Sequence, residues 1–387
     1  MVRHTIYVWA AAVTLAWGSE QCYAGVWTLE PTFSASAEYA TNPLLNDAPD
    51  SGSAVIANLG LTTHWDDGAV QLSATPQVRL GEATGSSPIG SNAYYVAALG
   101  DVRRERSEWS ASYKWADDSS ALREPQSGTL VRTNIRERTA DAALKWVKSI
   151  TERTQTTVAV NGQSLDYAAS ANTGLISYQY GTATADVSRD VSERTQVRVA
   201  AVLSRYQLPG SSYREDNTGL QVGVSGRMSP IWSYKLSLGT SRLSASTTTT
   251  RPSGANYAAT LDHAGSLVSW SAGLTRSVQP SGFGVLVDAL EANATARWQA
   301  TERSSYFVVG RRVQTTSLFS IFTLGARTYE SVTVGTFVRA TEVWDVNAQV
   351  NWQRLSANAT PFELPAVGRG FELVVSVARR FGRAKLM

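Results

Sequence analysis

Cysteine is almost absent from this chain of 387 residues, which contains a single one, Cys22. One thiol excludes an intramolecular disulfide and a cysteine-rich zinc site. Histidine is nearly as scarce, and beyond the N-terminal segment only His64 and His263 remain. Two isolated histidines are too few for a metal centre, so the sequence predicts neither a metal site nor a bound cofactor.

A hydrolytic site has equally little to build on. Nucleophilic catalysis needs a histidine that an acidic residue orients beside a serine or cysteine. Asp66 and Asp67 follow His64, and Asp262 precedes His263, but these acids lie at predicted turns. We therefore predict that the protein is not an enzyme, and a lipid-modifying enzyme stays the least favoured alternative.

Charge and long apolar runs are also limited. Charged residues make up 17% of the chain, and the net charge of +3 is close to balance. A nucleic-acid-binding protein would concentrate basic residues, so no nucleic-acid partner is expected. Beyond the first two dozen residues no run of about 18 apolar residues occurs, which predicts no transmembrane helix.

The first 24 residues have the build of a secretory signal peptide. Arg3 opens the segment, Ile6–Trp17 is apolar, and Cys22-Tyr23-Ala24 ends it with small residues at the cleavage positions. We place cleavage between Ala24 and Gly25, because Ser19-Glu20-Gln21 is too polar to precede a lipidated cysteine. Residues 25–387 are then predicted to form a single domain.

The chain does contain one β-hairpin sequence pattern that is repeated many times. In Ala292–Val309, apolar and polar residues alternate up to Trp298, pass a short polar turn, and alternate again from Tyr306. A period of two indicates a β-strand with one apolar and one polar face, and a short turn makes the pair antiparallel. Similar turns at Thr151-Glu152-Arg153, Ser192-Glu193-Arg194 and Thr341-Glu342 repeat the unit.

The repeated pattern predicts eighteen strands, with sixteen as the alternative. The expected strands are Trp27–Tyr39, Val55–Trp65, Val70–Leu80, Tyr95–Val102, Trp109–Trp115, Asp141–Lys148, Gln155–Gln163, Tyr180–Val187, Gln196–Tyr206, Leu220–Met228, Trp232–Leu238, Asn256–Leu261, Leu267–Thr275, Leu286–Trp298, Ser305–Val313, Val332–Val338, Val346–Trp352 and Phe371–Phe381. The weakest patterns are those of Asn256–Leu261 and Tyr95–Val102. Long loops, such as Thr41–Ser53 and Gly81–Ala93, alternate with short turns.

Both a soluble sandwich and a membrane barrel would show this alternation. On each predicted strand the face opposite the apolar one is hydrophilic, as in every second residue from Asp345 to Gln353. Such faces suit a water-filled lumen better than a soluble sandwich of eighteen strands. Six tryptophans stand beside short turns, as a membrane-interface girdle requires: Trp65, Trp109, Trp146, Trp232, Trp298 and Trp344. We predict an all-β fold: a closed antiparallel transmembrane β-barrel with short periplasmic turns and long extracellular loops.

Charged residues of both signs are expected on the inward face. The pore-lining candidates are Lys114, Lys145, Arg198, Lys235, Glu291, Arg297, Arg311 and Asp345. Mixed signs suit a hydrated pore without strong ion selectivity. A separate cluster, Arg123, Arg132, Arg136 and Arg138, is interpreted as a solvated strand end, with binding of lipopolysaccharide phosphates as the alternative.

One motif resembles a known family. Thr275-Arg276-Ser277-Val278-Gln279-Pro280-Ser281-Gly282-Phe283-Gly284 is similar to the SR-x-x-x-PSG-x-G loop of outer-membrane β-barrel proteins found with exopolysaccharide and exosortase (PEP-CTERM) systems. Trp27-x-x-Glu30-Pro31 and Tyr39-x-x-Asn42 resemble the same group. The resemblance implies a surface or secreted polysaccharide pathway and supplies no catalytic residues. The terminal strand ending at Phe381 resembles the signal that barrel-assembly machinery reads.

These patterns lead to an expected function. We expect a porin-like channel in the Gram-negative outer membrane, in contact with outer-membrane lipid and lipopolysaccharide and, through the resemblance, with polysaccharide and periplasmic export components. The alternative is a non-conducting scaffold with a plugged lumen. The candidate plug is Arg311–Tyr329, which contains Leu318, Phe319, Ile321 and Phe322, although an outward strand extension suits this segment slightly better.

Overall fold

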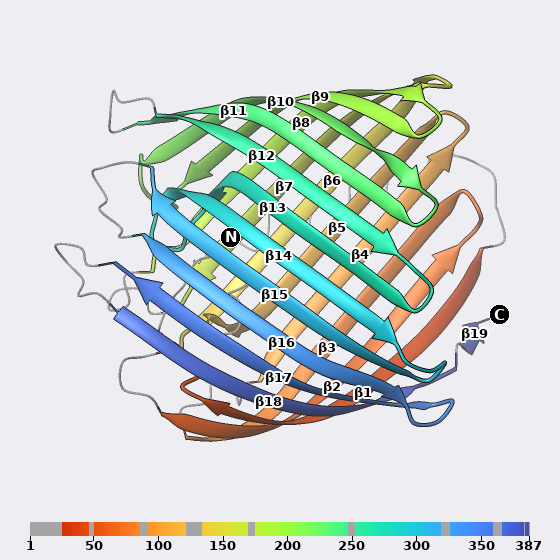
Figure 1. Ribbon diagram of the computed structural model, residues 1–387, viewed down its shortest axis with the longest axis vertical. Coiled ribbons are helices and arrows are strands. Elements are labelled where there is room, and N and C mark those ends of the chain that lie inside the picture. The colour runs from red at the N-terminus through yellow and green to blue at the C-terminus, as the bar shows by residue number, and fades with distance from the viewer. Residues whose placement is uncertain are drawn as a thin grey trace.

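The computed structural model is a closed antiparallel β-barrel of eighteen strands (Figure 1). It describes residues 25–45, 50–85, 92–120, 134–168, 175–246, 252–318, 326–358, 366–382 and 384–386. Each strand pairs with its neighbours in the sequence, and β1 pairs with β18 to close the ring. Among the described residues no helix is long and apolar enough to cross a membrane. The predicted fold and strand number are therefore confirmed.

The strands are longer than the apolar pattern alone indicates, at 12 to 16 residues each. They are β1 (Val26–Thr41), β2 (Ser51–Asp66), β3 (Val70–Gly85), β4 (Ala93–Arg104), β5 (Ser107–Ser119), β6 (Arg136–Thr151), β7 (Thr154–Tyr167), β8 (Tyr178–Ser192), β9 (Thr195–Gln207), β10 (Arg214–Ser229), β11 (Trp232–Ala245), β12 (Ser253–Ala264), β13 (Val268–Pro280), β14 (Leu286–Gln299), β15 (Ser304–Ser317), β16 (Arg327–Arg339), β17 (Trp344–Ala357) and β18 (Ala366–Arg380). The two weakest predictions are confirmed as β4 and β12.

The predicted loops Thr41–Ser53 and Gly81–Ala93 are wrong in their bounds. β1 ends at Thr41, but β2 already begins at Ser51 and β3 continues to Gly85, so strand pairing extends beyond the apolar residues. The hydroxyls of Ser53 and Thr84 form a 2.8 Å hydrogen bond across this polar extension. Polar side chains that pair across strands therefore lengthen the barrel walls where the apolar pattern has ended.

A short strand, β19 (Ala384–Leu386), follows β18 and pairs with Trp27–Leu29 of β1. The predicted last strand ended at Phe381, whereas β18 ends at Arg380 and the chain then resumes pairing. The tail beyond the terminal aromatic residue thus continues the seam that closes the barrel. Arg380 also forms a 2.8 Å hydrogen bond from Nη2 to Asp345 on β17, which holds the end of β18 inward.

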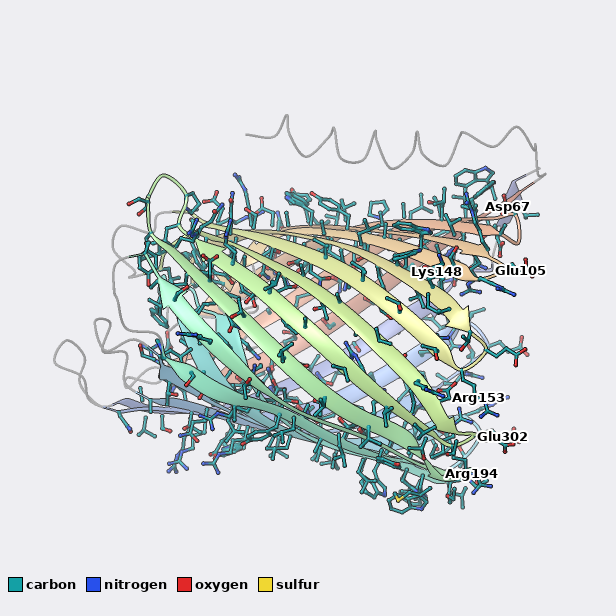
Figure 2. All side chains as sticks on the ribbon, turned by 90° about the horizontal axis from the view of Figure 1, so that it is seen from above. Asp67, Glu105, Lys148, Arg153, Arg194 and Glu302 are labelled. Carbon is teal, nitrogen blue, oxygen red and sulfur yellow. The ribbon has the colours of Figure 1, made fainter. Side chains whose placement is uncertain are left out.

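The two ends of the barrel differ, as the sequence predicts. At the short-turn end, hairpins such as Glu152-Arg153 between β6 and β7 leave charged residues at the rim, where Figure 2 labels Asp67, Glu105 and Arg194. The repeated Thr/Ser-Glu-Arg sequence has a structural cause, because the first hydroxyl accepts a hydrogen bond from the backbone N–H two residues later. This bond measures 3.3 Å at Thr151 and 3.2 Å at Ser192 and Thr301. It is a side-chain-stabilised turn.

A belt of exposed apolar side chains surrounds the barrel. Val55 is 66% exposed, Leu220 is 64% and Leu238 is 60%. In register, Val55 lies opposite Ala37, and Leu238 lies opposite Val222, so these side chains share one face of the sheet. Such a continuous apolar surface is suited to contact with lipid, because exposing it to water would be energetically unfavourable.

Candidate functional site in the barrel lumen

Contacts between distant strands define the inward face. Tyr206 of β9, Leu243 of β11 and Tyr178 of β8 pack in one buried cluster with Leu286 at the start of β14. Side chains of strands that are not neighbours can meet only inside the ring. Register from the three residues on β8, β9 and β11 then assigns every second residue of each strand to the lumen, and Leu286, the first residue of β14, is an exception to that alternation.

A loop folds into this lumen between β13 and β14, and it is the PSG segment of the sequence motif. The Ser281 N–H donates to the carbonyl of Val285 at 3.0 Å, and the Gly284 N–H donates to the Ser281 carbonyl at 3.2 Å. The Ser281 hydroxyl accepts from the Phe283 N–H at 3.2 Å. Gly284 has a φ of 86°, which favours glycine. These bonds make residues 281–285, hereafter the PSG loop, a compact turn.

The PSG loop is tied to β10 by one buried carboxylate. Oε2 of Glu215 accepts the backbone N–H of Leu286 at 2.8 Å, and its Oε1 accepts the hydroxyl of Tyr213. The Glu215 side chain is fully buried. Tyr213 lies just before β10, and its pKa is raised mainly by burial and in addition by the hydrogen bond to Glu215. Its hydroxyl therefore stays protonated and donates to the Glu215 carboxylate.

Strands next to β10 also hold the PSG loop by hydrogen bonds. The hydroxyl of Tyr206 donates to the carbonyl of Ser281 at 3.3 Å. The Ile176 N–H, just before β8, donates to the carbonyl of Gly282 at 2.8 Å. A Cβ at Gly282 would lie 2.4 Å from the hydroxyl oxygen of Tyr167, so any larger residue would require the tyrosine side chain to shift. The loop therefore reaches from β13 and β14 to the inner wall at β7–β9.

On its other side the PSG loop contacts β16. The guanidinium carbon of Arg327 lies 4.2 Å from the ring centroid of Phe283, a cation–π contact. Arg327 is the first residue of β16, at the long-loop end. Contacts with β7–β10 on one side and with β16 on the other mean that the PSG loop bridges the lumen.

A second segment covers the inner wall at β16–β18. Leu45, between β1 and β2, is buried against Tyr329 of β16 and Leu355 of β17. Asn42 supports it by donating from Nδ2 to the carbonyl of Arg369 at 3.1 Å. A Cβ at Gly368 would lie 1.8 Å from the Leu45 carbonyl oxygen, so β18 admits this segment only because glycine stands there.

Strand register places all eight charged candidates on the inward face. Lys114, Lys145, Arg198, Lys235 and Arg297 are exposed there, Glu291 and Arg311 are half-buried, and Asp345 is buried. Exposed side chains on an inward face require open space beside them. Most of the exposed cations lie towards the short-turn end, away from the PSG loop, so open space lies beside the wall there. That these residues line a conducting pore stays a prediction.

Several inward charges are already neutralised within the wall. Arg311 donates from Nε to Glu291 at 2.9 Å, and Arg198 lies 3.1 Å from Asp186. Arg79 and the Tyr95 hydroxyl both donate to Asp118 near the long-loop end. Among the residues that the structure describes, no ion pair is formed by Lys145, Lys235 or Arg297.

The six tryptophans all face outward at the short-turn end. Trp65 lies 6.4 Å from Trp27, Trp109 lies 5.7 Å from Trp146, and Trp298 stacks on Tyr306 at 5.5 Å between ring centroids. Trp232 contacts His263 and Trp270, and Trp344 lies 5.6 Å from the guanidinium of Arg379. The arrangement has the form of an aromatic girdle, and its membrane role stays a prediction.

His263 is therefore part of an aromatic cluster, with 4.8 Å between its ring centroid and that of Trp232. Its sequence neighbour Asp262 faces the lumen, where it accepts a 2.6 Å hydrogen bond from Ser271. The two side chains point in opposite directions and cannot act as a catalytic pair. Within the described ranges no group of three metal-ligating side chains occurs.

The arginine cluster is divided by the fold. Arg136 and Arg138 face outward at the long-loop end, where Arg138 lies 3.3 Å from Asp117 and Arg136 also contacts this carboxylate. Glu137 faces the opposite way and is buried. Arg123 and Arg132 lie outside the described residues.

The candidate plug Arg311–Tyr329 is mostly strand. β15 continues to Ser317 and β16 begins at Arg327, so the strand-extension interpretation holds for these parts. Leu318 packs against the buried cluster near the PSG loop. Phe319, Ile321 and Phe322 lie outside the described residues.

Comparison with known proteins adds the fold and little else. No family model and no curated protein matches the chain. OpdK of Pseudomonas aeruginosa, in a crystal structure with vanillate, is similar with a TM-score of 0.50 and 14% identity, over 92% of this chain and 99% of that one. A second structure of the outer-membrane protein OpdK gives 0.49 and 14%, over the same shares. At this identity the likeness shows a shared barrel fold.

Sequence reasoning missed the loop that narrows the lumen. It treated the PSG motif as a family marker and looked for a plug in the longer, more apolar segment that follows. The sequence does carry one sign of this loop, because the polar residues on the inward faces of β7, β8, β9 and β11 are interrupted. Apolar or aromatic residues stand there: Leu165, Tyr167, Tyr178, Tyr206 and Leu243. A wet lumen has no need of such residues unless a segment covers them.

Proposed function

We propose that this protein is an outer-membrane channel through which a hydrophilic solute diffuses, with the PSG loop as its constriction. The observation that carries the proposal is the set of exposed charged side chains on the inward face, including Lys145, Lys235 and Arg297. Charged groups in a dry or filled interior would need partners, whereas a hydrated passage solvates them. The apolar outer belt supports a place in the membrane, and residues 1–24 serve as the cleaved signal for export.

A solute from an exopolysaccharide system is the finer part of this proposal. It rests on the resemblance of the PSG motif and of Trp27-x-x-Glu30-Pro31 to outer-membrane proteins of such systems. A neutral or mixed-charge sugar chain suits a lumen with both signs of charge and many amide and hydroxyl groups, such as Asn161 and Thr182, which form a 3.1 Å hydrogen bond. Partners in assembly would be the barrel-assembly machinery and, in the pathway, periplasmic export components.

Planar-bilayer recording tests the conduit directly. The purified protein is expected to give discrete conductance steps with little ion preference, and deletion of Gly282–Gly284 is expected to raise the step size. A wild-type protein that stays silent while the deletion conducts would support the scaffold with a plugged lumen. Silence of both proteins, each folded by heat-modifiable migration on gels, would overturn the channel proposal.

A further inference from the structure

Charged side chains form a row on the outside of the barrel at the long-loop end. Register places Arg312 of β15 opposite Glu330 of β16, Glu330 opposite Arg354 of β17, and Arg354 opposite Arg369 of β18. All four positions lie on the outward face. The same face carries Val332, two residues from Glu330 on β16, and Val350, four residues from Arg354 on β17. The row, hereafter the arginine row, therefore contains three cations and one carboxylate.

The single carboxylate holds its arginines loosely. Nε of Arg312 lies 3.6 Å from Glu330, and Nη1 of Arg354 lies 3.7 Å from the same side chain. Nε of Arg354 is buried and has no hydrogen-bond partner among the described residues, and Arg369 is exposed and forms no ion pair with any of them. Like charges directly opposite each other on neighbouring strands destabilise a sheet. Among the described residues, the only ion pair that offsets the repulsion between Arg354 and Arg369 is the 3.7 Å contact of Arg354 with Glu330.

Other outward arginines at this end are better matched. Asp216 lies 2.7 Å from Arg205 and 3.0 Å from Arg214, and Asp288 accepts a 2.6 Å bond from Arg276. Both carboxylates sit within hydrogen-bond distance of their arginines. Among the outward charged groups that the structure describes at this end, the arginine row therefore has the largest excess of arginines over carboxylates and the longest contacts between them.

The arginine row lies at the height of a lipid headgroup. Ten residues of β17 separate Trp344, in the aromatic girdle, from Arg354. A strand rises about 3.3 Å per residue and tilts by roughly 40° in a barrel, so the vertical separation is about 25 Å. That height equals the apolar band of an outer-membrane barrel. Trp352 and Phe371, opposite each other in register, form the next outward pair below the arginines.

We propose that the arginine row binds the phosphate of a lipid headgroup in the outer leaflet. Guanidinium groups recognise phosphate through paired, charge-assisted hydrogen bonds, and a phosphate between Arg354 and Arg369 would relieve their repulsion. A lipid is favoured over a free phosphate because the acyl chains can lie on the apolar face directly below, along Val350 and Leu373, which are 46% exposed. The inference rests on the membrane location and is independent of conduction through the lumen.

Native mass spectrometry of the purified barrel in non-ionic detergent tests the proposal. The probes are lipid A with both phosphates, dephosphorylated lipid A and inorganic phosphate. The phosphorylated lipid is expected to bind, and R354Q/R369Q is expected to weaken it about tenfold or more, as the loss of charged hydrogen bonds implies. The control R205Q/R214Q removes the same charge from two arginines that share the carboxylate of Asp216 at hydrogen-bond distance, and it is expected to retain binding within about twofold.

A variant that is expected to increase binding distinguishes loss of the lipid site from a folding defect. Glu330→Gln removes the only carboxylate of the arginine row, so affinity for the phosphorylated lipid is expected to rise. Equal binding of dephosphorylated lipid, equal loss in the control, or saturation by inorganic phosphate alone would each overturn the proposal. Single-channel conductance of R354Q/R369Q is expected to match the wild type, which separates this inference from the proposed channel.

Discussion

The carboxylate of Glu215 on β10 accepts a 2.8 Å hydrogen bond from the backbone N–H of Leu286, which begins β14 four strands away around the sheet. The same carboxylate accepts the hydroxyl of Tyr213. One buried group thus ties the constriction to the barrel wall at β10. Withdrawal of the PSG loop would leave the Glu215 carboxylate without the Leu286 partner, which costs roughly 1–3 kcal/mol.

Glu215→Ala is therefore expected to loosen the PSG loop. The variant leaves the Leu286 N–H and the Tyr213 hydroxyl without their acceptor, so single-channel steps should become larger and noisier. Glu372→Ala is the matched control, because Glu372 also faces the lumen and accepts only a 3.2 Å bond from Asn351 among the hydrogen bonds described. Comparable changes from both variants would indicate a general effect of lumen charge.

The glycines of the PSG loop give a second prediction. Gly282→Ala would place a Cβ 2.4 Å from the Tyr167 hydroxyl oxygen, and Gly284→Ala would keep a φ of 86° that costs about 1–2 kcal/mol for other residues. Both variants are expected to lower the temperature at which the folded barrel unfolds, as seen by heat-modifiable migration on gels, and to increase the size of the single-channel conductance steps. Gly310→Ala on β15, where nothing lies within 4 Å of the new Cβ, should leave both measurements unchanged.

Face assignment can be tested at one pair of neighbours on β14. Ala294 faces the lipid and lies opposite Gly310, whereas Thr295 faces the lumen opposite Val309. Ala294→Arg is expected to cost roughly 2–4 kcal/mol near the midplane, as measured by denaturant-dependent folding into lipid vesicles. Thr295→Arg places the same charge in a hydrated lumen and should be nearly neutral. Equal costs would show that the assigned faces are wrong.

The barrel could be predicted from sequence because lipid imposes strict rules on its walls. Alternation along Ala292–Trp298 and the repeated turn at Thr301 reflect requirements of every hairpin, so the eighteen strands could be counted. Loop bounds were less accessible, since polar residues such as Ser53 and Thr84 lie equally well in a loop or in a paired strand beyond the membrane.

The constriction could not be predicted because its contacts join residues far apart in sequence. Glu215 and Leu286 are 71 positions apart, and Tyr206 meets Ser281 across 75. Local periodicity carries no information about such pairs. The nearest local sign is a tyrosine at an inward position such as Tyr206, and its meaning becomes clear only when the segment that covers it is known.

Phe283 provides the last prediction, because it joins the tip of the PSG loop to β16. Its ring receives the guanidinium of Arg327 at 4.2 Å, a contact worth roughly 0.5–2 kcal/mol according to its burial. Phe283→Ala removes both the ring and the cation–π contact, so the loop tip should lose its hold on β16 and the conductance should rise. Phe283→Trp keeps an aromatic face towards Arg327 and adds volume, so the conductance should stay equal or fall. If the PSG loop bridges the open lumen, planar-bilayer recordings at the same salt concentration should therefore show a rise in conductance for Phe283→Ala and no rise for Phe283→Trp. An equal rise in both would mean that disturbance of the fold, rather than loss of the bridge, controls the current.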